Sequence, residues 1–148
     1  MKALLSLALL FSLAASAEDC LRYIGTCQYY LCRENEHACG TKGYYLGFAY
    51  KYCLNAESKL NHHLSEEGKV WSKNVSQCLR DSVERIPYDD NCTDAKQTAF
   101  REHGDCYVDT GFCQLSHKDQ LHVAWFVKKE IRRPIVLKQG FSILSECR

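Results

Sequence analysis

Ten cysteines constrain this chain of 148 residues more than any other feature of its sequence. They begin at Cys20 and end at Cys147, so they extend over the whole chain after its first 19 residues. An even number of cysteines in a small secreted chain is typical of a disulfide framework, which here means five bridges. Each bridge stabilises a fold by about 2–4 kcal/mol. Ten cysteines allow about a thousand pairings, and sequence physics does not choose among them.

The N-terminus has the three parts of a secretory signal peptide. Lys2 gives a positively charged start, residues 3–13 are mostly apolar, and Ala15-Ser16-Ala17 forms a cleavage site of small residues. The apolar run is too short to span a bilayer as a stable helix. We therefore expect residues 1–17 to be a signal peptide and residues 18–148 to be a single domain. The domain is expected to be secreted and extracellular, or periplasmic if the source is bacterial.

The charge of the chain argues against a nucleic-acid partner. The sequence contains 19 Lys and Arg residues and 18 Asp and Glu residues, and cleavage would remove Lys2. The mature domain is then close to neutral, whereas a nucleic-acid-binding protein needs a basic surface for phosphates. Residues 128–133 contain a local basic patch, which is typical of a solvated helix face. No second apolar stretch approaches the length of a membrane span.

Two stretches of apolar residues recur at every third or fourth position, which is the pattern of amphipathic helices. Residues 45–64 predict one long helix with His63 on its apolar, packed face. Residues 71–86 predict a second helix that ends at Pro87. Since the sequence has only two prolines, helices are favoured over the many tight turns of a small all-β domain.

The second half of the chain predicts further helices. One covers residues 93–103 and stops at Gly104, and an irregular segment then extends to residue 115. Ser116 and Asp119 form a capping box that begins another helix. This helix is expected to extend to Pro134. We expect it to lie centrally in the fold, because residues 123–127 are apolar on nearly all sides. Residues 135–137 are expected to be extended or a buried turn, and residues 141–144 to start a short last helix. The expected fold is all-α: a small multi-helix domain of four to five helices, stapled by five disulfides.

The cysteine spacing and the residues around it resemble the stanniocalcin family of secreted glycoprotein hormones. The resemblance covers essentially the whole mature chain. It depends on Cys27-Gln-Tyr-Tyr-Leu-Cys32, on Cys39-Gly-Thr-Lys-Gly43, on Gly68-Lys69 with Cys78-Leu79, on Cys92 with Cys106-Tyr107 after thirteen residues and Cys113 after five more, and on Ile143-Leu-Ser-Glu-Cys147.

The resemblance implies a disulfide pairing and an assembly state. Family members form dimers through an eleventh cysteine in a C-terminal extension, whereas this chain has ten cysteines and ends at Arg148. We therefore expect no disulfide-linked dimer. A non-covalent dimer through Trp71, Trp125 or the tyrosine-rich residues 44–52 stays open. The implied bridges are Cys20–Cys32, Cys27–Cys53, Cys39–Cys92, Cys78–Cys106 and Cys113–Cys147.

The sequence does not single out catalytic or metal-binding residues. His62 and His63 are neighbours, so their side chains diverge by about 100° on a helix. His117 and His122 are five positions apart, unlike the i, i+4 pair of helical zinc ligands. Asp89-Asp90 is a weak calcium signal, because calcium takes six to eight oxygens. We expect no catalytic residue, metal or cofactor. Asn74-Val-Ser76 and Asn91-Cys-Thr93 are formal glycosylation sites.

These features predict a secreted, non-enzymatic binding or signalling protein. The resemblance implies hormone-like action in calcium and phosphate homeostasis, or inhibition of an extracellular metalloprotease by binding. The expected partner is then a protein, either a receptor or an extracellular protease. The alternative is a small secreted or periplasmic helical enzyme, or an effector without a hormonal role.

Overall fold

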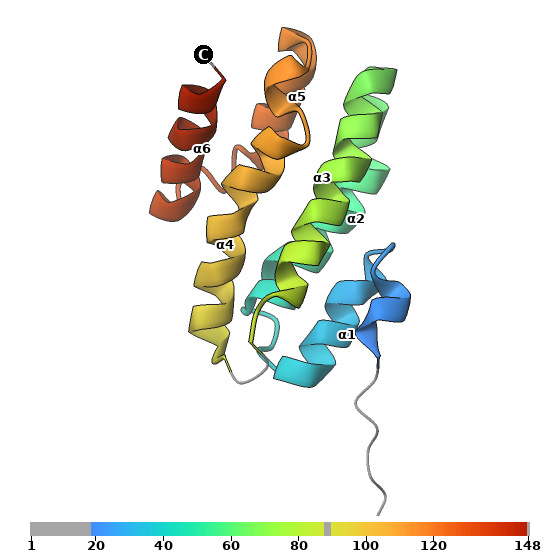
Figure 1. Cartoon of the computed structure of the whole chain (residues 1–148), viewed down its shortest axis with the longest axis vertical. Helices are drawn as coiled ribbons and strands as arrows, with labels where there is room; N and C mark the ends of the chain where they lie inside the picture. The colour runs from blue at the N-terminus through green and yellow to red at the C-terminus, as the bar shows by residue number, and fades with distance from the viewer. Residues whose placement is uncertain (1–18, 88–89, 148) are drawn as a thin grey trace, which may run out of the picture.

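The computed structural model describes residues 19–87 and 90–147, and every regular element in these residues is helical (Figure 1). The predicted all-α class is therefore confirmed. The predicted signal peptide and residue 89 lie outside the described residues. No described helix combines the length and the hydropathy that crossing a membrane requires. The α-helices are α1 (Gln28–His37), α2 (Lys51–Ser58), α3 (Glu66–Glu84), α4 (Cys92–Asp109), α5 (His117–Val127) and α6 (Pro134–Glu146).

Short turns of other helical types connect these elements. Three are 3₁₀ turns, at Cys20–Tyr23, Leu60–His62 and Phe112–Gln114, and Tyr45–Tyr50 is a π-helical turn. The described residues thus contain six α-helices, compared with the four to five that the sequence predicts. The additional helix is α1, which lies within the N-terminal cysteine cluster.

Five disulfides fasten the helices to one another. All ten cysteines lie in the described residues, and none is free. The Cα atoms of the paired cysteines are 4.9–5.7 Å apart, within the usual range. The pairs are those that the family resemblance implies: Cys20–Cys32, Cys27–Cys53, Cys39–Cys92, Cys78–Cys106 and Cys113–Cys147.

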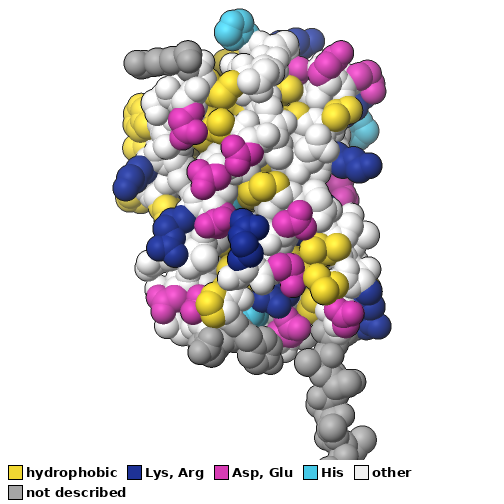
Figure 2. All heavy atoms as spheres, in the orientation of Figure 1, with side chains coloured by type: hydrophobic (Ala, Val, Ile, Leu, Met, Phe, Trp, Pro, Cys, Tyr) yellow, Lys and Arg dark blue, Asp and Glu magenta, His cyan; other side chains and the backbone are white. Residues whose placement is uncertain are grey.

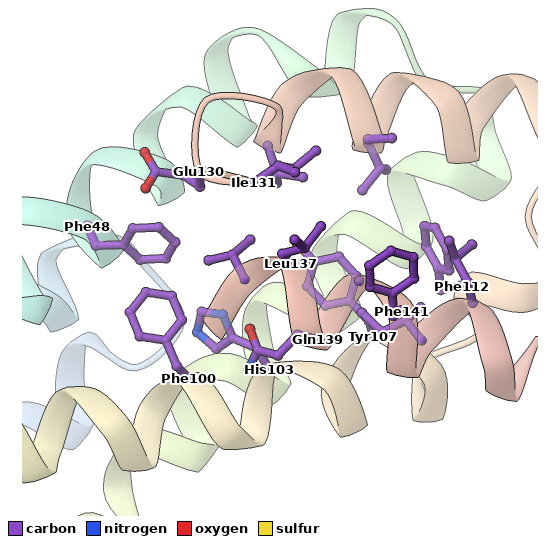
Figure 3. A pocket seen from close by; sticks show the side chains of 17 residues that line it. Phe48, Phe100, His103, Tyr107, Phe112, Glu130, Ile131, Leu137, Gln139 and Phe141 are labelled. Carbon is purple, nitrogen blue, oxygen red and sulfur yellow. The ribbon is translucent and has the colours of Figure 1, made fainter. Parts of the chain in front are cut away.

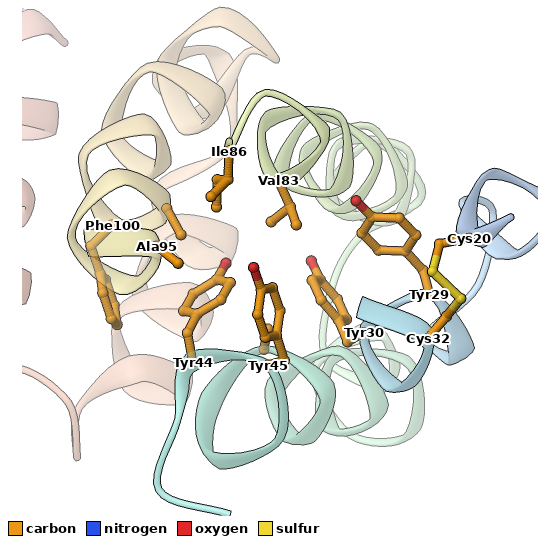
Figure 4. Packing of buried hydrophobic residues seen from close by; sticks show 12 residues of the cluster. Cys20, Tyr29, Tyr30, Cys32, Tyr44, Tyr45, Val83, Ile86, Ala95 and Phe100 are labelled. Atoms are coloured by element: carbon orange, nitrogen blue, oxygen red, sulfur yellow. A yellow bond between two sulfur atoms is a disulfide. The ribbon is translucent and has the colours of Figure 1, made fainter. Parts of the chain in front are cut away.

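One part of the core is a cluster of tyrosines at the lower end of the molecule in Figure 1. Tyr30, Tyr44 and Tyr45 lie side by side and point towards Val83 of α3 (Figure 4). The Tyr44 and Tyr45 rings meet edge to face, an arrangement that their quadrupoles favour. Tyr44 and Tyr45 are at most 1% exposed, so they are not available as a dimer surface. Trp71, another of the suggested dimer contacts, is 3% exposed in the other part of the core, where it packs on Tyr107.

A buried carboxylate joins the first turns of α3 and α5. Asp119 accepts hydrogen bonds from the Ser65 amide at 2.9 Å, from the Ser65 hydroxyl at 2.7 Å and from the Ser116 hydroxyl at 2.9 Å. Ser65 caps α3 through the Gly68 amide, and Ser116 caps α5 through the Asp119 amide, as the sequence predicts for Ser116. Burial by itself raises the pKa of Asp119, but these hydrogen bonds outweigh it and hold the pKa below its usual value.

The predicted single helix over residues 45–64 is wrong. The structure places a π-helical turn, α2 and a 3₁₀ turn in this stretch, with a break at Lys59. Apolar periodicity does not reveal this, because wider and tighter helical turns still place apolar residues at every third to fifth position. At Gly47 a Cβ atom would lie 2.7 Å from the Thr41 carbonyl oxygen, so the close approach of the chain here requires glycine.

The predicted stop at Gly104 is also wrong, since α4 continues to Asp109 and includes residues expected to be irregular. Gly104 keeps a helical conformation, and the left-handed residue that follows α4 is Gly111, with φ 101°. Beyond Gly104, the bridge from Cys106 to Cys78 of α3 holds the last turns of α4 in place.

The C-terminal third departs most from the prediction. α5 ends at Val127, and Pro134 begins α6 instead of ending a helix, as its missing amide hydrogen and fixed φ permit at a first helical position. The residues expected to be an extended segment or a buried turn thus belong to α6. Nor is α5 central, because Leu121 and Trp125 are both 70% exposed. His63, predicted to be packed, is exposed and stacks on His122.

Candidate functional site

The candidate site is an apolar cavity of about 260 Å³ between α4, α5 and α6, which we call the α4–α6 cavity (Figure 3). Figure 3 shows an elongated arrangement, with Phe48 and Phe100 at one end and Phe112 and Phe141 towards the other. The walls are almost entirely hydrophobic. Representative lining residues are Phe100, Phe112, Val123, Val127, Phe141 and Ile143.

The sequence of α6 explains how this cavity stays partly open. α6 packs directly against α4, while Leu137, Phe141 and Leu144 follow the i, i+4, i+7 spacing of one helix face and border the cavity. These three side chains are 44%, 65% and 60% exposed. A soluble domain rarely leaves a contiguous apolar surface uncovered unless the surface binds something.

The cavity wall contains few polar groups, and two of them, His103 and Glu130, already contact other polar side chains of the protein. The His103 ring lies 3.1 Å from the Tyr44 hydroxyl and packs among Tyr44, Phe48 and Phe100. This burial lowers the pKa of His103 to about 4, so the imidazole is neutral at physiological pH. Glu130 accepts a hydrogen bond from the Tyr52 hydroxyl at 2.7 Å and pairs with the Arg133 guanidinium at 2.7 Å.

A third polar group of the wall is unoccupied. The amide nitrogen of Gln139 is buried, and within the described part of the chain it has no hydrogen-bond partner. Figure 3 shows the Gln139 side chain beside His103 in this view. Buried donors nearly always have an acceptor, so this nitrogen can bind an acceptor atom of a ligand.

Basic residues cluster along the chain next to residues that line one end of the cavity. We call Lys128, Lys129, Arg132, Arg133 and Lys138 the rim cations, because each is adjacent in sequence to a lining residue or, for Arg133, contacts one. The Arg133 guanidinium lies 5.9 Å from the centre of the Phe48 ring, which places it at the Phe48 end. Glu130 is the single acidic residue between positions 128 and 138. On the face shown in Figure 2, acidic and basic side chains are interspersed.

The predicted glycosylation sites have different surroundings. Asn74 is exposed on α3, on the polar side that the sequence indicates. The Asn91 side chain instead caps α4: its oxygen accepts from the Thr93 and Asp94 amides, and its nitrogen donates to the Asp94 carboxylate. Attachment of a glycan at Asn91 would use the nitrogen that donates to the Asp94 carboxylate, whereas the oxygen makes the cap.

The histidines do not form a metal-binding group in the described residues. His63 and His122 stack with ring centres 5.4 Å apart, but no third ligand joins them. His62 and His117 are exposed. The one described group with ligand spacing contains Cys27, Cys53 and Glu57, and its two sulfurs form a disulfide.

The α4–α6 cavity is absent from the sequence-based expectations. One signal was available, since Leu137, Phe141 and Leu144 have the spacing of an apolar helix face. Reading Pro134 as a helix end instead of a helix start divided this face and concealed it.

Searches against protein-family models, curated proteins and solved structures find no match for this chain. The resemblance to stanniocalcins therefore stays a prediction that depends on the residues quoted above.

Proposed function

We propose that this chain is a secreted, non-enzymatic binding protein and that the α4–α6 cavity is its binding site. The observation that carries the proposal is an open apolar cavity bordered by exposed Leu137, Phe141 and Leu144. Ligand sites in proteins are typically concave and apolar, with a few polar groups. Five disulfides and the absence of a membrane-crossing helix among the described residues fit an extracellular location.

The chemistry of the walls favours binding over catalysis. General acid–base catalysis needs a group that exchanges a proton near the working pH. His103 is held neutral, and Glu130 accepts a hydrogen bond from Tyr52 and forms an ion pair with Arg133. These features support a binding protein over the alternative of a small secreted or periplasmic enzyme. If the resemblance to stanniocalcins holds, binding would serve hormone-like signalling or inhibition of an extracellular protease.

The test is titration with N-phenyl-1-naphthylamine, an uncharged dye that fluoresces in apolar surroundings. We expect one dye molecule to bind per chain. In the variant Gly140→Leu, we expect binding to weaken by at least tenfold. Gly140 lines the cavity, and a Cβ atom there meets no heavy atom within 4 Å, so the leucine fills empty space.

Gly104→Leu is the matched control. Gly104 also lies within a helix, and its Cβ position is also open, but it does not line the cavity. Both substitutions replace a helical glycine, which favours the helix by up to about 1 kcal/mol. Equal dye affinity in the wild type and in Gly140→Leu, or absence of dye binding in the wild type, would contradict the proposal.

A further inference from the structure

We propose that the ligand of the α4–α6 cavity is a single-chain amphiphile with an anionic head group, of which a fatty-acid carboxylate is the simplest. This inference rests on the proposed function and names the chemical class of its ligand.

The size and shape of the cavity select a chain. An engineered cavity of about 150 Å³ binds benzene, and drug-sized ligands occupy about 300–1,000 Å³. At about 260 Å³ this cavity lies between the two. Its elongated form, from Phe48 to Phe112 in Figure 3, matches an alkyl chain better than a compact ring system. Neutral His103 adds no charge to the wall, so an alkyl chain meets uncharged surroundings except at the Glu130–Arg133 ion pair.

The rim cations select the head group. Glu130, the acid among them, is neutralised by Arg133, whose side chain is still 46% exposed. Within the described residues, Lys128, Lys129, Arg132 and Lys138 form no ion pair. Lys128 lies over the Trp125 ring, with its nitrogen 2.9 Å from the ring centre. Basic residues concentrated in the segment that supplies the lining residues Val127, Glu130 and Ile131 complement an anionic head and disfavour a cationic one.

The buried Gln139 amide supplies a specific contact. A carboxylate oxygen accepts hydrogen bonds and would satisfy this donor, whereas an ammonium group donates and would not. Charge and hydrogen bonding at this end of the cavity thus favour the same class of head group.

Displacement of N-phenyl-1-naphthylamine by three ligands of equal chain length tests the inference. Dodecanoate and dodecylammonium are compared below their critical micelle concentrations, and dodecanol below its solubility limit, at pH 7.4 and low salt. We expect dodecanoate to displace the dye at a concentration about tenfold lower than dodecanol, a difference of about 1.4 kcal/mol. Dodecylammonium should be the weakest. High salt should reduce the advantage of dodecanoate, because it screens the exposed cations.

Charge variants separate the head-group contact from general apolar binding. In the double variant Arg132→Gln and Lys138→Gln, we expect the tenfold advantage to shrink to about threefold or less while affinity for dodecanol is unchanged. The matched control is Lys73→Gln, which removes an exposed cation from α3, away from the cavity. It should leave the advantage intact.

Distinct outcomes would overturn the inference and the proposed function. If the dye binds but dodecanol or dodecylammonium competes as well as dodecanoate, the head-group assignment is wrong and the proposed function stands. If neither the dye nor any ligand binds, both are wrong. If light scattering shows a dimer and this dimer does not bind the dye, a second copy is the occupant and the inference also fails.

Discussion

Asp119 joins the N-termini of α3 and α5, and replacing its carboxylate by an amide should destabilise the fold. In Asp119→Asn, the remaining carbonyl oxygen still accepts from the Ser65 amide, but an NH₂ group faces the hydroxyls of Ser65 and Ser116. A hydrogen bond to a charged group contributes about 1.5–3 kcal/mol. Removing a negative charge from a helix N-terminus costs about 0.3–1 kcal/mol more for each helix. We expect the free energy of unfolding to fall by about 2–4 kcal/mol.

The effect should depend on pH in a defined direction. In the unfolded chain an aspartate has a pKa of about 3.9, and in the folded state the pKa of Asp119 is lower. The folded state therefore binds fewer protons, so the stabilisation is complete above about pH 4 and is lost as the pH falls through the folded pKa. The difference between the wild type and Asp119→Asn should be largest near pH 7 and should shrink at pH 3 and below.

Urea denaturation followed by far-UV circular dichroism, with the disulfides intact, measures this difference. Asp105→Asn is the matched control, since Asp105 is exposed on α4, and its substitution should change stability by no more than about 0.5 kcal/mol. A loss of less than about 1 kcal/mol in Asp119→Asn, or a loss that is equal at pH 7 and pH 3, would refute the role assigned to this carboxylate.

Two further predictions concern His103 and the cysteines. Because the pKa of His103 is lowered to about 4, from about 6.5 in the unfolded chain, stability should be retained above pH 6.5 and fall as the pH decreases towards 4. In a nuclear magnetic resonance titration its ring signals should not shift above pH 5.5, and a midpoint between pH 6 and 7 would contradict the buried environment. Since all ten cysteines pair within the chain, a non-reducing gel should show a monomer; a dimer band that disappears on reduction would show that at least one internal bridge is wrong.

Local sequence signals predict the elements that depend on neighbouring residues. The apolar face of α3 and the Ser116 cap of α5 belong to this class, and the structure confirms both. The second role of Asp119, at the start of α3, depends on Ser65, which is 54 positions away. No periodicity encodes such a long-range contact. The same applies to the disulfides, whose pairing was implied by family resemblance and not by spacing.

The expectations for α5 fail for a reason connected with the proposed site. Apolar residues on nearly all sides of a helix usually indicate a central position. In α5, Val123 packs into the core, whereas Trp125 lies in solvent at 70% exposure. Sequence rules that assume complete burial fail where a protein leaves apolar surface open, and such places are often functional.

The location of a bound apolar molecule tests the account most directly. Nuclear Overhauser contacts between N-phenyl-1-naphthylamine and the protein methyl groups can be measured in the wild type. If the dye binds in the α4–α6 cavity, we expect contacts to the methyl groups of Val123, Val127 and Ile143. Contacts instead to Leu21, Leu54 or Val70, which are exposed apolar residues outside the cavity, would contradict it.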